Sequence, residues 1–120
     1  MDQETFAAEV AAEWRARIEH TRAEAARGEQ GVPMGRLIEA AAAEPVLRAL
    51  FPWTSMACLS VSASTDFRTW GTEGIPGIVA WRSGFTVLEG HGRENTVLLE
   101  TDDPVVAVAY LAGWLRERRR

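Results

Sequence analysis

The residues whose side chains could best take part in a reaction lie in a segment rich in turn-forming residues, TDFRTWGTEGIP at positions 65–76. Asp66 and Glu73 each supply a carboxylate that could donate or accept a proton, and Trp70 lies between them in the sequence. A long connection of this kind in a compact domain is often functional. With Trp81 as a second wall, the segment could form a pocket for acid-base catalysis that needs no cofactor.

The side chains that usually bind metals or act as nucleophiles offer little in this chain. His20 and His91 are the two histidines, and neither is spaced from the other or from Cys58 as metal ligands are. His91 stands between two glycines, where a polar side chain is generally exposed in a turn. Cys58 alternates with apolar neighbours, so we expect an inert, buried thiol. The sequence therefore predicts no metal and no cofactor.

Composition and charge restrict the class of partner. The chain has 120 residues, 47% of them hydrophobic, which fits one globular domain. Its net charge of −4 disfavours binding to nucleic acid, and the basic residues at 116–120 suit the last turn of a helix. No stretch approaches the ~20 apolar residues of a membrane span, and the acidic amino terminus is unlike a secretory signal. We expect a cytoplasmic protein that binds neither nucleic acid nor membranes.

Three helical segments are expected to position these groups. An amphipathic helix over 2–27, capped by Asp2, is predicted by apolar residues at four-residue spacing, namely Phe6, Val10, Trp14 and Ile18. A second helix over 33–51 should be kinked or divided at Pro45. Asp103 followed by proline predicts the start of a last helix over 103–118. The attraction of a helix N-terminus for acidic residues then explains the cluster of Glu100, Asp102 and Asp103.

Between the second and the last helix the hydrophobic period changes to two, which predicts strands. FPWTS at 51–55 would be the corner where the helix ends, and residues 56–100 should form four strands, with a tight hairpin at Ser83 and Gly84. The order α-α-β-β-β-β-α predicts a single two-layer α+β domain over 1–120. Its antiparallel four-stranded meander should carry the helices mainly on one face.

The other face of this sheet is expected to expose apolar side chains. Pairing across the hairpin places Phe85 and Val87 on one face and Trp81 with Leu88 on the other. If Phe85 and Val87 belong to the core, Trp81 and Leu88 face away from the helices and could form a groove or a partner surface. We therefore expect a ligand or partner surface that comprises Trp70, Trp81, Asp66, Glu73 and Leu88.

The last helix carries apolar residues on two sides. One stripe includes Val108 and Leu115, and a second comprises Val106, Tyr110 and Trp114. A helix with two apolar sides must pack against two neighbours, and the second neighbour could be another part of the chain or a second subunit. We favour cover by the first helix over a homodimer, because the apolar stripe of the first helix also needs a partner.

Two sequence patterns resemble a known family. RLIEAAAAEP at 36–45 and LRALFPWTS at 47–55 are similar to the helix and aromatic-Pro-aromatic-Thr-Ser corner of an uncharacterised actinobacterial domain-of-unknown-function family, often labelled natural product biosynthesis proteins. LETDD at 99–103, with the apolar run after it, matches that family's closing strand and helix. The resemblance covers about residues 13–115. It implies an accessory role in natural-product biosynthesis, and it supplies neither a reaction nor catalytic residues.

The sequence as a whole favours a small non-catalytic accessory or binding protein over an enzyme. Its partner would be a protein, a peptide or a small hydrophobic metabolite. One alternative is the cofactor-free enzyme, with its pocket between the open sheet face and loop 65–76 and with Asp66 or Glu73 as the acid-base group. Another is an immunity-type inhibitor, which would bind one protein tightly.

Overall fold

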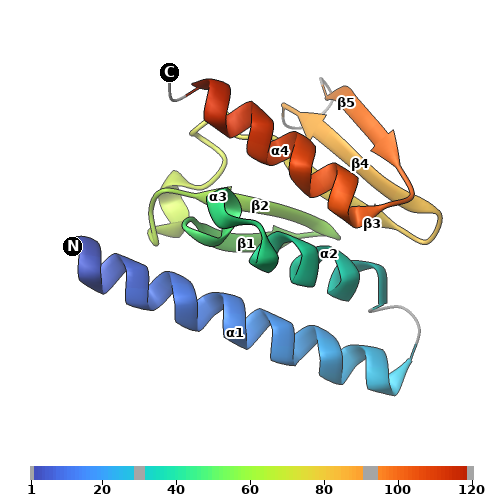
Figure 1. Cartoon of the computed structure of the whole chain (residues 1–120), viewed down its shortest axis with the longest axis horizontal. Coiled ribbons are helices and arrows are strands. Elements are labelled where there is room, and N and C mark those ends of the chain that lie inside the picture. Colours follow the sequence, from blue (N-terminus) through green and yellow to red (C-terminus); the bar gives the residue numbers. More distant parts are fainter. Residues whose placement is uncertain (1, 29–31, 91–94, 119–120) are drawn as a thin grey trace.

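Helices precede and follow an antiparallel sheet in the computed structural model, which describes residues 2–28, 32–90 and 95–118 (Figure 1). The predicted α+β class is confirmed, but the sheet has five strands where the sequence analysis expected four. In chain order, the helices and strands are α1 (Gln3–Arg27), α2 (Val32–Ala43), α3 (Pro45–Arg48), β1 (Phe51–Ser55), β2 (Cys58–Ser62), a short 3-10 helix (Phe67–Thr69), β3 (Gly77–Trp81), β4 (Gly84–Glu89), β5 (Thr96–Thr101) and α4 (Pro104–Arg118).

Local capping explains where the helices begin. The Asp2 carboxylate accepts a hydrogen bond from the Thr5 amide at 2.7 Å, as predicted. The second helical segment is fully divided at Pro45, because the Glu44 carboxylate caps α3 and accepts bonds from the next two free amides. Asp103 caps α4 through the Val105 amide at 2.9 Å.

Residues 51–55 form a strand instead of the expected corner. Strand β1 pairs with β2 along its whole length, from Phe51 opposite Ser62 to Ser55 opposite Cys58. Two residues join the strands, and both have positive φ, 49° and 65°, as a type I′ hairpin requires. The sheet therefore spans 51–101, and the helical segment before it ends at residue 48. Pro52 is tolerated because β1 is an edge strand.

The helices cover one face of the sheet (Figure 1). Strand order is β1-β2-β3-β4-β5, with every neighbouring pair antiparallel. The core lies between the two layers and includes Leu59, Val61, Ile78, Phe85 and Val87 from the sheet with Leu37, Ile38, Leu47 and Leu111 from the helices. Burying each such side chain stabilises the fold by about 1.5–3 kcal/mol. The opposite side of the sheet, called the open face below, carries the alternate residues of each strand.

Helix α1 covers the β1 edge of the sheet. The Trp14 indole donates to the Leu50 carbonyl oxygen at 3.0 Å, and Arg17 donates to the Thr54 hydroxyl oxygen at 2.7 Å. Because α1 packs on α2 and β1, it does not cover the second apolar side of α4. Val106 and Tyr110 are 45% and 38% exposed. The prediction that the first helix covers this side of α4 was therefore wrong.

No helix within the described ranges is both long enough and apolar enough to cross a membrane.

Candidate ligand-binding site

Loop 65–76 folds back over the open face at the β1-β2 end of the sheet. The ring of Trp70 stacks on Phe51 and on Trp53, with centroids 5.6 Å away in both pairs and interplanar angles of 27° and 13°. Its indole N–H donates to the Ser64 carbonyl oxygen at 2.9 Å. Ser62 lies on the same side of the sheet as these rings and is fully buried. Trp70 therefore closes this part of the open face.

The two carboxylates of the loop hold its backbone in place. Glu73 accepts a hydrogen bond from the Ser62 hydroxyl and another from the Ala63 amide at 3.0 Å. Asp66 accepts from the Arg68 amide at 3.0 Å and pairs with the Arg68 guanidinium at 2.9 Å. The Arg68 side chain lowers the pKa of Asp66, so this carboxylate is ionised at neutral pH. Both groups are already engaged in local structure.

Cys58, His91 and possible metal ligands are the remaining candidates for reactive side chains. Burial raises the pKa of the Cys58 thiol, which makes the thiolate scarce at neutral pH. His91 lies outside the described residues. Within the described ranges, no group of three or more histidine, cysteine, aspartate or glutamate side chains could hold a metal ion.

Trp81 lies on a different part of the sheet from Trp70. Its side chain is 53% exposed, and its indole N–H donates to the Thr86 hydroxyl oxygen at 2.9 Å. Leu88 is half-buried on the same face and stands opposite Val97, which is 53% exposed. The expected surface is thus divided into Trp70, Asp66 and Glu73 over β1-β2, and Trp81 with Leu88 on β3-β4.

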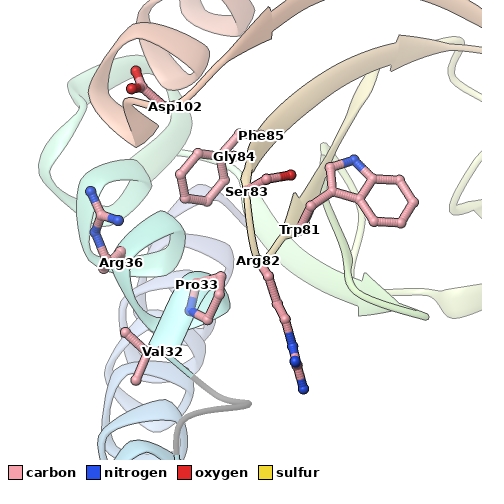
Figure 2. A pocket seen from close by; sticks show the side chains of 9 residues that line it. All are labelled: Val32, Pro33, Arg36, Trp81, Arg82, Ser83, Gly84, Phe85 and Asp102. Atoms are coloured by element: carbon pink, nitrogen blue, oxygen red, sulfur yellow. The ribbon is translucent and has the colours of Figure 1, made fainter.

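A pocket of about 680 Å³ opens beside the β3-β4 hairpin (Figure 2). This volume is within the range of sites that bind small molecules. The first turn of α2, the hairpin and the residue after β5 line it, and we call it the hairpin pocket. Its apolar lining residues are Val32, Pro33, Trp81 and Phe85, and its polar ones are Arg36, Arg82, Ser83 and Asp102.

The hairpin turn places Arg82 at this pocket. Trp81 pairs with Gly84, so the two turn residues are Arg82 and Ser83, one position earlier than the sequence analysis expected. Gly84 has a φ of 153°, and a Cβ atom there would lie 2.7 Å from the Thr101 carbonyl oxygen. Glycine thus allows the hairpin to approach the end of β5 closely.

Two arginines of the hairpin pocket have no carboxylate partner within the described residues, although Arg17, Arg22, Arg68, Arg116 and Arg118 each pair with one. The guanidinium carbon of Arg36 lies 5.9 Å from the centre of the Phe85 ring. In Figure 2 the Arg36 guanidinium lies on the Asp102 side, the Arg82 guanidinium extends to the opposite end, and Phe85 and Pro33 lie between. The pocket therefore combines apolar lining with the Arg82 guanidinium at one end and with Arg36 and the Asp102 carboxylate at the other.

Of the surface residues predicted from the sequence, Trp81 lines this pocket, and neither of its arginines was among them. Arg36 and Arg82 come together only because α2 packs beside the hairpin, which is a tertiary contact. The sequence feature that could have indicated this pocket is the position of Arg82, between an exposed tryptophan and a serine in a turn.

A search of the curated proteins gave no match, and neither did a search of the solved structures. A family model does match, over residues 8–117, and this range contains both patterns of the resemblance described above. The chain therefore belongs to the family of unknown function DUF6193.

Proposed function

We propose that this chain is a small non-catalytic binding protein, and that its hairpin pocket receives a ligand with an apolar body and at least one anionic group. The observation that carries the proposal is the pair of arginines without carboxylate partners, Arg36 and Arg82, on either side of an apolar floor. A guanidinium group binds carboxylate or phosphate through paired, charge-assisted hydrogen bonds. Trp81, which is 53% exposed, offers a large flat surface to an apolar ligand body, and Val32 and Pro33 add apolar contact.

The state of the loop carboxylates supports binding over catalysis. An enzyme at loop 65–76 would need Asp66 or Glu73 as a free acid-base group, and both are engaged in local hydrogen bonds. The lowered pKa of Asp66 also makes it a poor base near neutral pH. These contacts favour a binding protein over the enzyme alternative at this loop.

The pathway is a separate part of the proposal. The resemblance of the segments at 36–45 and 47–55 supports an accessory role in natural-product biosynthesis in an actinobacterial cytoplasm. There the ligand would be an acidic peptide or a small hydrophobic metabolite that bears a carboxylate or phosphate. An immunity-type inhibitor would instead bind a folded protein and leave the hairpin pocket empty.

The proposal is tested by titrating labelled protein with three probes, dodecanoate, an N-acyl glycine and a glutamate-rich peptide, while recording heteronuclear NMR spectra. We expect saturable shifts of the Trp81 indole N–H signal with at least one probe. Arg82→Gln and Arg36→Gln should each weaken that binding about tenfold, which is about 1.4 kcal/mol. Arg27→Gln is the matched control, because Arg27 is exposed at the end of α1, outside the hairpin pocket.

Two results would overturn the proposal. One is that no probe binds, which removes the proposed ligand class. The other is that the Arg82 variant and the Arg27 control bind a probe equally well, which removes the arginine from the site.

A further inference from the structure

The two edges of the sheet differ in how they are protected. Strand β1 has a proline within it, and α1 lies along it with two side-chain hydrogen bonds to residues 50 and 54. Strand β5, TVLLET, forms the other edge and contains no proline. No strand within the described ranges pairs with its outer side. Its pairing with β4 contains one register shift, opposite Val87 and Leu88, and β1 and α1 do not reach it. An edge whose outer side is unpaired is a template for pairing with another strand.

The uncovered apolar side of α4 lies next to this edge. We call it the α4 stripe, and it consists of the exposed Val106 and Tyr110 and the half-buried Trp114. Arg118 lies 4.4 Å above the Trp114 ring and pairs with Glu89 at the end of β4, so this side of the helix faces the sheet end.

The opposite side of α4 faces the other helices. Arg116 pairs with Glu44, the residue that caps α3, at 2.9 Å. At about 100° per residue, Trp114 lies about 40° from Arg118 and about 160° from Arg116 around the helix axis. Tyr110 is a further 40° or so from Trp114. These two aromatic residues of the α4 stripe thus lie on the β5 side of the helix, away from α3.

The charges at the two ends of this side of α4 favour a second copy as the partner. Asp103 precedes the helix, and Arg118 lies in its last turn beside Trp114. A surface that is acidic at one end and basic at the other matches its own copy when the copy runs in the opposite direction. Antiparallel pairing of β5 with the β5 of a second copy imposes that opposite direction on the two α4 helices. It also places both helices on the same side of one continuous sheet.

We propose that β5 and the α4 stripe form the dimerisation surface for a second copy of this chain. Pairing of the two β5 strands satisfies the outer backbone groups of each edge. Tyr110 and Trp114 of each copy pack against those of the other, and the acidic start of each α4 lies opposite the basic end of its partner. The inference is independent of the proposed ligand, because it uses neither Arg36 nor Arg82.

Sedimentation velocity over a concentration series tests the surface with a matched pair of variants. We expect the wild-type protein to be a dimer, and Tyr110→Glu to raise the dimer dissociation constant at least tenfold. Val105→Glu is the control, because Val105 is 62% exposed on the same helix but lies about 140° away from Tyr110 around the axis. This control should dissociate no more readily than the wild-type protein. Circular dichroism of each variant shows that the fold is retained.

A second variant tests the strand separately from the helix. Val97 is 53% exposed on β5, so Val97→Lys introduces an edge lysine without disturbing the core, and it should also raise the dissociation constant at least tenfold. A wild-type protein that is monomeric throughout the series overturns the proposal. So does a Val105 control that dissociates as readily as the Tyr110 variant, and so does a dimer that survives the Val97 substitution.

Discussion

Replacing Trp70 with alanine tests whether the aromatic stack holds loop 65–76 on the sheet. The indole stacks on two rings, each with its centroid 5.6 Å away, and it donates one hydrogen bond at 2.9 Å. An aromatic pair contributes about 0.5–1.5 kcal/mol beyond area burial, and a hydrogen bond contributes about the same. Since the side chain is half-buried, we expect Trp70→Ala to lower the free energy of unfolding by about 2–4 kcal/mol.

Trp81→Ala is the matched control for this substitution. The Trp81 side chain is 53% exposed, and its one hydrogen bond goes to the Thr86 hydroxyl group. Its removal should cost about 1 kcal/mol or less, because surface substitutions usually have small effects. The two substitutions therefore compare a tryptophan with a structural role, Trp70, and a tryptophan with a proposed recognition role, Trp81.

Urea unfolding followed by far-ultraviolet circular dichroism measures both values. Trp70→Phe should fall between the wild-type protein and Trp70→Ala, because it retains an aromatic ring and loses the hydrogen bond to Ser64. If Trp70→Ala costs less than about 1 kcal/mol, or if Trp81→Ala costs as much as Trp70→Ala, the stack does not hold the loop and our reasoning is refuted.

Three further predictions concern backbone and charge. Ala57→Gly should raise the free energy of unfolding by about 1 kcal/mol in urea titrations, because Ala57 has a φ of 65° that glycine adopts without strain. Gly84→Ala should lower it by about 2 kcal/mol in the same titrations, because its Cβ would lie 2.7 Å from the Thr101 carbonyl oxygen. The pKa of Asp66 is lowered in the folded protein, so its stabilising effect is present above the unfolded pKa of about 3.9 and is lost as the pH falls through the folded value. The difference in unfolding free energy between wild type and Asp66→Asn should therefore shrink between pH 7 and pH 2, and a difference that does not depend on pH would contradict this assignment.

The helices could be predicted closely because their ends depend on local signals. Asp2, Pro45 and Asp103 each act within a few residues of their own position, and the structure places a helix start at each of them. The alternation that identified Phe85 and Val87 as core is also local, and both are buried between the layers.

Strand β1 could not be predicted because its signals are tertiary. Met56 and Ala57 lack the asparagine or glycine that usually marks a type I′ turn, and Pro52 argues against a strand. The strand is held instead by its pairing with β2 and by hydrogen bonds from α1 to Thr54 and to Leu50, the residue before the strand. The same limit applies to the site. The fold separates Trp70 from Trp81, which the sequence analysis had grouped, and it places Arg36 and Arg82 at one pocket.

The turn at Met56 and Ala57 also bears on the order in which the chain folds. A hairpin that closes through two non-glycine residues with positive φ gains no local stability from its turn, so it is a poor nucleus. Contacts from α1, more than thirty residues earlier in the chain, must compensate for this cost. We therefore expect β1 to join the sheet only after α1 has docked. In native-state hydrogen exchange, the amides of β1 should then open at lower free energy than those of β3 and β4.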